Sequence, residues 1–490
     1  MPVSKFLAVD LGSESGRVIV GILNDDRITI EEIHRFPNPQ IRALNRVHWD
    51  IHYLFKEVKK GLSLAAGNGH EDLESIGIDT WGVDFGFVGK DGALLGDPYC
   101  YRDPRTNGMM EEVLRKISRE EIYASTGIQF MQINSLYQLY AASLNEKESF
   151  RQCETVLFMP DLFNYLLTGR KVSEYTVAST SQMLNAWSRT WDDALLRKIG
   201  LPPDIMAPII QPGSIIGTLL PEVAGETGIS NDTDVVAVGC HDTASAVAAV
   251  PGRGKNWAYI SSGTWSIVGI ESDRPLIDNN TLADDFTNEG GVGGKIRFLR
   301  NVTGLWLLQE CRKSWKKHGD IPEYEELVKT ASAAEGFKCM IDPDDPSFLD
   351  PPDMPEAIVR YCRGHSQPVP ETTGEFVRCI LESLAMKYRA MIEKIGSLTH
   401  RTIETIHIVG GGSRNAMLNQ FTADATGIPV EAGPVEASAL GNIIVQAIAE
   451  GKISSIEEGR AMVARSFPVR RYDPIDPQKW DEFSRTAALK

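Results

Sequence analysis

Three strand-like stretches open the chain. Residues 6–9 and 17–23 are dominated by β-branched and large apolar side chains, and residues 27–35 alternate imperfectly between apolar and polar ones. The short polar turn between the last two predicts an antiparallel meander. Asp50 then precedes apolar residues at helical spacing, which predicts an N-cap and a helix. A short apolar run at residues 75–79 predicts a buried strand, so the order is β-β-β-α-β.

The same order returns about 250 residues later. Residues 257–260 and 265–270 predict a second hairpin around a bend of small residues. A third strand is predicted at residues 296–299, after the turn-rich residues 288–295, and a helix at residues 305–317. Further along we expect a helix at residues 374–395, a strand at residues 405–409 and a helix at residues 415–426.

This repetition concerns the order of elements, not the letters of the sequence. A hairpin with a glycine-containing bend, a strand and a helix occur twice, which favours an α/β fold of two related domains with an active-site cleft between them. We place the first domain at residues 1–246 and the second at residues 247–490.

Composition excludes several classes of protein. The 490 residues are enough for two or three domains. The net charge of −16 argues against a nucleic-acid partner, because phosphate backbones are bound by clustered Lys and Arg. No apolar run approaches the roughly 20 residues of a membrane span, and the N-terminus lacks the apolar stretch of a signal peptide. We therefore expect a cytoplasmic protein without a nucleic-acid or membrane partner.

The seven cysteines are scattered and contain no CxxC pair, which disfavours a structural zinc site. An odd number in a large chain is typical of reduced cytosolic thiols. Cys362 and Cys379 flank a proline-containing loop, and we predict two unlinked thiols there.

The first bend, VDLGSESGR at residues 9–17, has the composition of a phosphate site. Glycine and serine in a hairpin bend leave backbone N–H groups uncovered, and such groups form a concavity that binds anions. Arg17 adds a cation, and Asp10 at the strand's end is suited to hold Mg²⁺ through water. Glu14 does not suit a phosphate and is expected to point outward or to be bridged. A plain hairpin with a solvated acidic tip is the alternative.

Two further strand exits carry candidate chemistry. The strand at residues 235–238 leads to Asp242, and a carboxylate at the C-terminal end of a strand is where α/β folds place reactive groups. Asp242 is equally suited to cap the helix that follows. The second exit, HIVGGGSRN at residues 407–415, runs from a strand through three glycines into a helix, which suits a close backbone approach to a ligand. It lacks the GxGxxG pattern, so a Rossmann dinucleotide site is disfavoured.

Together these stretches resemble the actin-like ATPase superfamily and, within it, the FGGY carbohydrate kinases. DLGSESGR is similar to the first phosphate loop of that family, SSGTWS to the second, VGGGSRN to the adenosine loop, and GCHDTASA to the segment with the catalytic aspartate. The segments EIHRFPN, SIGIDTWGVDF, PYCYRDPRTNGMM and AGPVEASALGNI resemble the L-rhamnulose kinase subfamily, in this order, over nearly the whole chain.

The resemblance implies two ribonuclease H-like domains, the first binding sugar and the second binding nucleotide. It implies transfer of a phosphoryl group from ATP to the 1-hydroxyl of L-rhamnulose, with Mg²⁺, in L-rhamnose catabolism. It leaves open whether the protein is a monomer or a homodimer. The alternatives are another ketose kinase of the family, for L-fuculose, L-ribulose or xylulose, and an actin-like chaperone or filament ATPase.

The resemblance also implies roles for single residues. Asp242 resembles the general base, and a carboxylate with an ordinary pKa near 4 is ionised at pH 7 and can accept the proton of an alcohol. Asp10 and Asp242 are expected to hold the metal. The residues expected to bind sugar are Trp81, Gly82, Asp84, His241, Asp242, Thr243 and Asn301, with Tyr101, Arg102 and Asp103 extending the same wall. The residues expected to bind ATP are Ser13, Glu14, Ser15, Gly16, Arg17, Thr264, Gln309 and Gly411.

Overall fold

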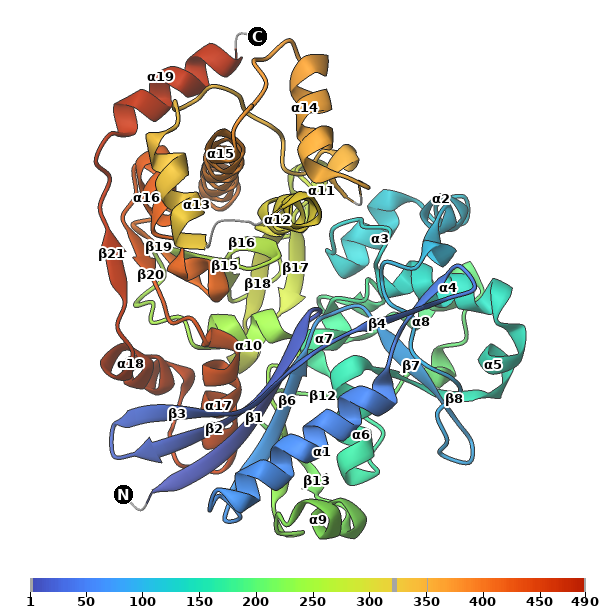
Figure 1. The fold of residues 1–490 in the computed structure, drawn as a ribbon. Coiled ribbons are helices and arrows are strands. Elements are labelled where there is room, and N and C mark those ends of the chain that lie inside the picture. The colour runs from blue at the N-terminus through green and yellow to red at the C-terminus, as the bar shows by residue number, and fades with distance from the viewer. Residues whose placement is uncertain (1–2, 320–323, 350, 489–490) are drawn as a thin grey trace. The chain divides into compact units, whose positions relative to one another are not determined.

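The computed structural model of the chain describes residues 3–319, 324–349 and 351–488 (Figure 1). The chain divides into two compact units. Unit 1 consists of Met1–Pro251, Glu271–Phe298 and Ala437–Ser466, and unit 2 consists of Gly252–Ile270, Leu299–Glu436 and Phe467–Lys490. Unit 1 thus includes two segments from beyond residue 246, where we predicted the first domain to end; that boundary stays a prediction.

Unit 1 is built on a sheet with the strand order β13-β14-β6-β1-β2-β3. The first three strands form the predicted antiparallel meander, and β6 and β14 run parallel to β1. Strand β6 is wholly buried and β1 and β14 nearly so, as is usual for parallel strands that helices cover on both faces. The strands are β1 (Ser4–Leu11), β2 (Ser15–Asn24), β3 (Arg27–Pro37), β6 (Ser75–Thr80), β13 (Ser214–Thr218) and β14 (Asp234–Ala237).

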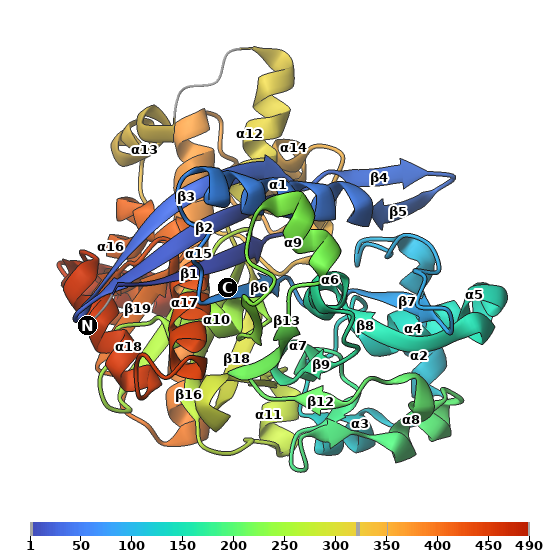
Figure 2. The same cartoon turned by 90° about the horizontal axis from the view of Figure 1, so that it is seen from below.

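Two helices cover opposite faces of this sheet, α1 (Ile51–Gly67) and α17 (Ala437–Ala449), as Figure 2 shows. Gly61 of α1 lies against Val18, whereas Gly21 lies against Ile443 of α17. Residues 18 and 21 of β2 are three positions apart. Because side chains alternate between the two faces of a strand, these positions lie on opposite faces of the sheet. The predicted cap of α1 is confirmed, because Asp50 accepts a hydrogen bond from the backbone of the first turn.

The remaining elements of unit 1 contribute to two apolar clusters: one lies between the sheet and α1, α6 and α9, and the other is built from further helices and short strands. The short strands are β4 (Gln40–Ala43), β5 (Arg46–Trp49), β7 (Phe85–Gly89), β8 (Cys153–Phe158), β9 (Ser173–Glu174), β10 (Leu184–Asn185), β11 (Thr190–Trp191) and β12 (Ile209–Ile210). The helices are α2 (Met109–Leu114), α3 (Arg119–Thr126), α4 (Ser135–Asn145), α5 (Lys147–Gln152), α6 (Met159–Thr168), α7 (Tyr175–Ser179), α8 (Asp193–Ile199), α9 (Pro221–Thr227), α10 (Asp242–Ala248), α11 (Asn279–Ala283) and α18 (Ile456–Ser466).

The second large sheet has the order β17-β18-β16-β15-β19-β20-β21. Strands β15 and β16 form the predicted second hairpin, and β19 and β20 continue parallel to β15. The strands are β15 (Trp257–Ser262), β16 (Trp265–Ser272), β17 (Thr287–Gly290), β18 (Ile296–Thr303), β19 (Thr405–Val409), β20 (Val430–Ala432) and β21 (Arg470–Tyr472).

Strand β17, like β20 and β21, was not predicted. We predicted only turn structure at residues 288–295, yet β17 occupies the start of that stretch and is buried along its whole length. The last residue of this strand, Gly290, is required to be glycine by packing, because a Cβ there would lie 2.6 Å from the ring of Tyr175. The glycine that reads as a turn signal is therefore a site of close packing inside a strand.

Three helices of unit 2, α12, α15 and α16, lie where helices were predicted, and α15 runs four residues beyond its predicted end; α13, α14 and α19 were not predicted. The long helix α15 starts with a capping box in which Thr372 and Glu375 bond to each other's backbone N–H, and it packs against α13 and α16. The helices are α12 (Trp306–His318), α13 (Tyr324–Ala333), α14 (Met354–Gly364), α15 (Thr373–Thr399), α16 (Ala416–Thr426) and α19 (Pro477–Ala488).

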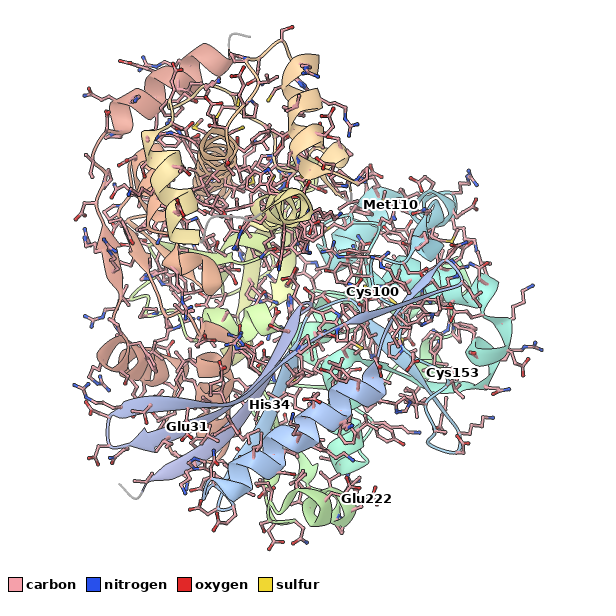
Figure 3. The ribbon with its side chains drawn as sticks, viewed as in Figure 1. Glu31, His34, Cys100, Met110, Cys153 and Glu222 are labelled. Atoms are coloured by element: carbon pink, nitrogen blue, oxygen red, sulfur yellow. The ribbon has the colours of Figure 1, made fainter. Side chains whose placement is uncertain are left out.

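The seven cysteines are all free and buried; Figure 3 labels Cys100 and Cys153. The prediction that Cys362 and Cys379 are unlinked is confirmed. Among the described residues, no helix combines the length and the apolar character needed to cross a membrane.

The contact of α10 with α17 yields a test of packing. A Cβ at Gly441 would overlap the carbonyl oxygen of Ser245, and backbone cannot move as a side chain can. We expect Gly441→Ala to lower the free energy of unfolding by about 1–3 kcal/mol or more, measured by urea denaturation. The control is Gly225→Ala in α9, where a Cβ meets open space; alanine should stabilise that helix by about 0.5–1 kcal/mol. Equal effects of the two substitutions would contradict the close approach.

Candidate active site

Three carboxylates of unit 1 lie in or just after the C-terminal ends of neighbouring strands. Asp10 of β1 and Asp79 of β6 are Cα partners in the parallel register. The next residue of β6, Thr80, forms a parallel bridge with His241 and donates from its N to the carbonyl oxygen of Cys240, 2.9 Å away. These contacts bring the exits of β1 and β6 beside the start of α10, at the carboxyl edge where α/β sheets bind ligands.

Asp242 is the first residue of α10, and His241 is the N-cap. The alternative in which Asp242 caps this helix is therefore wrong. The side chain of Asp242 is 29% exposed, and its Oδ1 accepts a hydrogen bond from Thr243 Oγ1 at 3.1 Å. A partly exposed carboxylate at a strand exit is free to meet a substrate.

The other two carboxylates are buried and also have protein partners. Asp10 is buried and lies 2.5 Å from the guanidinium of Arg17, its neighbour across the hairpin. Asp79 Oδ2 accepts a hydrogen bond from Asn442 Nδ2 at 2.6 Å. Burial, together with the negative charge of Asp10, raises the pKa of Asp79 well above its usual value. Asp79 was not among the predicted site residues, because an aspartate inside a strand gives no motif of its own.

The first bend is held by a residue that we did not predict. Asn38 donates from Nδ2 to the carbonyl oxygen of Gly12 and from its backbone N to that of Glu14. The Glu14 side chain is exposed, as expected. Gly16 is required by packing, since a Cβ there would lie 2.5 Å from the ring of Phe36. Ser13, Ser15 and Arg17 are partly accessible.

Buried charges lie behind His241. Its Nδ1 is 3.0 Å from Nη2 of Arg297 and 3.2 Å from Oε2 of Glu289, and the guanidinium and carboxylate are 3.0 Å apart. Arg297 is fully buried. Burial alone would raise the pKa of Glu289, but the charges and hydrogen bonds of Arg297 and His241 together outweigh burial and lower the pKa. We missed both residues, because they come from β17 and β18, more than forty residues after His241.

A second buried carboxylate supports the same strand exit. Glu174 Oε2 accepts hydrogen bonds from the backbone N of Cys240 at 3.2 Å and from Thr176 Oγ1 at 2.6 Å. Thr176 Oγ1 in turn accepts from the backbone N of His241 at 3.1 Å. Burial raises the pKa of Glu174 to about 7, although its hydrogen-bond donors oppose the shift. Glu174 and Thr176 thus fix the backbone of the two residues that precede Asp242.

The predicted sugar wall is largely buried. Trp81 is only 6% exposed and its ring centroid lies 4.3 Å from that of Trp49, so little of it is accessible as a platform. Asp84 is fully buried, which leaves it no surface for a ligand. Asp103 is also buried and accepts from the backbone N of Val47. Tyr101 is buried and Arg102 half-buried.

In unit 2 the second bend and the triple glycine lie side by side. Gly410 and Gly412 both pack against Ser262, so a side chain at either position would collide with β15. Gly411 is exposed and a Cβ there meets nothing within 4 Å. Of the three glycines, it is therefore the one open to a ligand. The bend itself is fixed by α12, since Trp306 donates from its N to the carbonyl oxygen of Thr264.

Two further predicted site residues of unit 2 are partly accessible, one expected to bind sugar and the other ATP. Asn301 lies on β18 and Gln309 on α12, and both are half-buried. Gln309 Oε1 is buried and has no hydrogen-bond partner among the described residues, which leaves it available to a donor.

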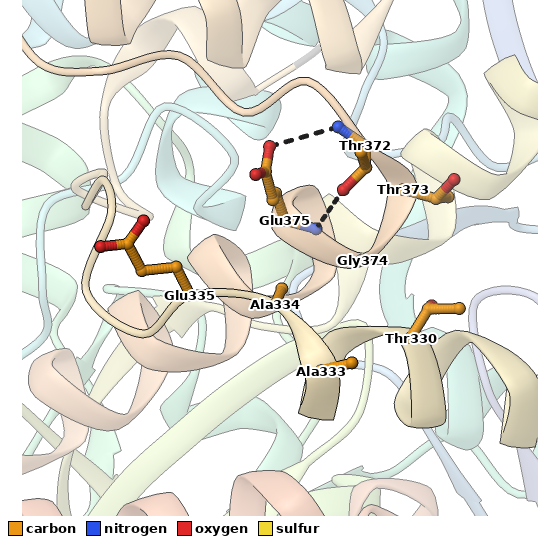
Figure 4. A pocket seen from close by; sticks show the side chains of 8 residues that line it. All are labelled: Thr330, Ala333, Ala334, Glu335, Thr372, Thr373, Gly374 and Glu375. Atoms are coloured by element: carbon orange, nitrogen blue, oxygen red, sulfur yellow. Dashed lines mark hydrogen bonds between the residues drawn. The ribbon is translucent and has the colours of Figure 1, made fainter.

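A surface pocket of about 480 Å³ lies elsewhere in unit 2, beside the N-terminus of α15 (Figure 4). Its lining includes Thr330 and Glu335 together with the capping box of α15, and it contains no predicted site residue. The described residues also contain no group of three or more His, Cys, Asp or Glu side chains arranged to hold a metal ion. A metal ion bound to these described residues would need oxygen atoms from a ligand to complete its coordination.

The fold and these strand exits define a class of protein. The family model described as "FGGY family of carbohydrate kinases, N-terminal domain" matches residues 5–249, and that for the C-terminal domain matches residues 258–450. The chain therefore belongs to the FGGY family of carbohydrate kinases, with ATP as the co-substrate.

Individual relatives narrow the assignment within the family. A rhamnulokinase of Bacteroides thetaiotaomicron is 49% identical over 97% of each chain. A rhamnulokinase of Pectobacterium carotovorum is 44% identical over 97% of this chain and 94% of its own. The predicted similarity to L-rhamnulose kinases over nearly the whole chain is confirmed.

Solved structures with low identity share the fold. The xylulose kinase of Lactobacillus acidophilus superposes with a TM-score of 0.81 at 16% identity, covering 99% of this chain and 96% of that one. The glycerol kinase of Plasmodium falciparum with ADP gives a TM-score of 0.76 at 14% identity, covering 99% and 98%. The predicted two-domain, actin-like α/β fold is confirmed, and a chaperone or filament ATPase is not favoured.

The buried pair behind His241 predicts a large stability effect. Glu289→Gln leaves the fully buried Arg297 without a compensating charge, so we expect a loss of about 3–5 kcal/mol in the free energy of unfolding. The control is Asp273→Asn, which breaks an exposed ion pair with Lys295 in the same unit and should cost at most about 1 kcal/mol. Urea denaturation measures both. Similar small losses would show that the charge of Arg297 is not held by Glu289.

Glu174 predicts a pH dependence with a defined sign. Its pKa is higher in the folded state, about 7, than its ordinary value of 4.5, so proton binding favours folding. The stabilisation is complete below pH 4.5 and is lost as the pH rises to 7. Relative to Glu174→Gln, the wild type should lose about 3 kcal/mol of unfolding free energy across this interval. Urea denaturation at several pH values tests this, and parallel curves for the two proteins would contradict it.

Proposed function

We propose that this protein transfers the γ-phosphoryl group of ATP to the 1-hydroxyl of L-rhamnulose, giving L-rhamnulose 1-phosphate and ADP, in the catabolism of L-rhamnose. The observation that carries the proposal is the 49% identity to a rhamnulokinase over 97% of each chain. The partly exposed Asp242 at the exit of β14 supports it, because phosphorylation of an alcohol needs a group to accept the hydroxyl proton.

In the proposed reaction, the proton of the sugar hydroxyl passes to the carboxylate of Asp242, the hydroxyl oxygen bonds to the γ-phosphorus, and ADP leaves. Thr243 Oγ1 donates to Asp242 Oδ1 and so fixes the carboxylate's orientation. Gly82 and His241 are proposed to contact the sugar, with Thr243 and Asn301. A loose phosphoryl-transfer transition state makes positioning and charge neutralisation the main work of these groups.

For the nucleotide, we propose contacts from both strand hairpins and from the open glycine. The proposed residues are Ser13, Glu14, Ser15, Gly16, Arg17, Thr264, Gln309 and Gly411. The accessible Gly411 and the unpartnered Gln309 Oε1 support this set. The packing of Gly16 against Phe36 indicates that this residue acts through the shape of the bend. Residues 1–246 are proposed as the sugar-binding domain and residues 247–490 as the nucleotide-binding domain.

We also propose a magnesium site at Asp10 and Asp242. The donor set fits, because Mg²⁺ commonly takes one or two carboxylates and completes its shell with phosphate oxygens and water. Bound there, the ion would neutralise phosphate charge. Arg17, 2.5 Å from Asp10, holds that carboxylate at the exit of β1. The seven free thiols support a cytoplasmic location, and the assembly state is proposed as monomer or homodimer.

A panel of ketoses tests the substrate. ADP release is measured with L-rhamnulose, L-fuculose, L-ribulose and xylulose at equal concentrations. We expect L-rhamnulose to give the highest kcat/KM, because the chain is 49% and 44% identical to two enzymes named for that sugar. A higher kcat/KM for another ketose would assign the chain to that substrate and leave the kinase assignment standing.

Asp242→Asn tests the base. The amide cannot accept the proton, so we expect turnover to fall by about 10²–10⁴-fold while sugar binding, measured by calorimetry, stays within about threefold. Asp232→Asn, at an exposed position before β14, is the control and should keep wild-type turnover. Near-normal turnover of the Asp242 variant would remove this residue from the role.

A further inference from the structure

Asp84 is the centre of a buried hydrogen-bond cluster. Its Oδ2 accepts from Trp49 Nε1 at 2.6 Å, from Trp81 Nε1 at 3.0 Å and from the backbone N of Tyr101 at 3.1 Å. Its Oδ1 accepts from Gln138 Nε2 at 2.8 Å. Both carboxylate oxygens are therefore engaged, and the residue is fully buried. Burial raises its pKa to about 6, so the carboxylate is ionised at neutral pH.

The residue before it has an unusual backbone. Val83 adopts φ = +68°, a left-handed conformation that is a genuine outlier for a β-branched side chain. Such strain persists only where the surroundings fix it. Here Val83 N donates to Thr180 Oγ1 at 3.2 Å, and its carbonyl oxygen accepts from Ser135 Oγ at 2.6 Å. The bonds of Val83 to Thr180 and Ser135, together with those of Asp84, therefore fix the backbone of residues 81–83.

At Gly82 the segment has no side chain, and its backbone lies close to His241, the residue before Asp242. A Cβ at Gly82 would lie 3.4 Å from His241 Nε2 and 3.1 Å from Thr180 Oγ1. Thr80, just before the segment, is bridged to His241. The segment 81–83 is thus fixed between the buried cluster of Asp84 on one side and the proposed sugar-binding residue His241 on the other.

We propose that Asp84 is a positioning residue for sugar recognition: it does not bind the sugar, but its cluster with Trp49, Trp81 and Gln138 holds Gly82 at the distance from His241 that the sugar requires. This inference rests on the proposed function. A direct role for Asp84 would need an accessible oxygen, and both of its oxygens are occupied by protein donors. Reorganising the cluster shifts the backbone of the segment, and small misplacements of binding groups cost much in recognition.

Two substitutions probe the cluster from different sides. Asp84→Asn replaces one acceptor oxygen by a donor, which must face an N–H group of the cluster. Trp49→Phe removes a single donor to Asp84 from a side chain that is fully buried and cannot touch the sugar. We expect the KM for the sugar to rise about 10–100-fold in the first variant and in the same direction, by less, in the second. The KM for ATP should stay within about twofold in both.

The control is Trp191→Phe. Trp191 is partly buried and donates from Nε1 to the carbonyl oxygen of Ala207 at 2.7 Å, an acceptor outside the hydrogen-bond cluster of Asp84. It loses one indole hydrogen bond, as Trp49→Phe does, and should keep both KM values. A purely structural role of Trp49 would lower the amount of folded enzyme without separating the KM for sugar from the KM for ATP.

A second ketose that differs from L-rhamnulose at one hydroxyl distinguishes positioning from direct contact. Positioning predicts that Asp84→Asn raises the KM for both sugars by a similar factor. A factor confined to one sugar, or a wild-type sugar KM in Trp49→Phe, would overturn the proposal. If Asp84→Asn does not fold, Trp49→Phe alone decides. Failure of the wild type to phosphorylate L-rhamnulose would overturn the proposed substrate instead, and the ratios are then measured with the ketose that it accepts.

Discussion

The parallel register of β1 with β6 is the constraint on which the candidate site depends. It pairs Asp10 with Asp79, and one residue later it brings Thr80 beside His241. Successive side chains of a strand alternate between faces, so a slip of β1 by one residue would turn Asp10 to the face opposite Asp79. The start of α10 with its carboxylate lies beside this edge of the unit 1 sheet.

The edge is supported by buried ionisable groups that face away from any substrate. Glu174 bonds to the backbone that leads to Asp242, Glu289 and Arg297 lie behind His241, and Asp84 lies behind the segment 81–83. Burying a charge is costly unless it is paired or hydrogen-bonded, and each of these groups has such partners. An apolar core would be cheaper but would not fix a backbone segment, because only directional bonds define its position.

Much of the local structure could be predicted from the sequence because its causes are local. The antiparallel meander follows from adjacent strands and a polar turn, and the helix after Asp50 follows from its cap and its apolar spacing. What could not be predicted depends on distant contacts. The return of α17 to unit 1, the ion pair of Glu289 with Arg297, and the strand that ends at Gly290 each require knowledge of which segments meet.

The glycines of the motifs also fall into two groups: some are required by packing within the protein, and others are open to a ligand. Gly16 is required by Phe36, and Gly412 by Ser262, so neither needs a ligand to explain it. Gly411 alone of these three faces open space. A glycine-rich motif of this kind therefore specifies the path of the backbone after the strand. That path forms a concavity, and the concavity determines which ligand can bind. This explains why the family could be assigned from short glycine-rich segments while the role of each residue within them required the packing around it.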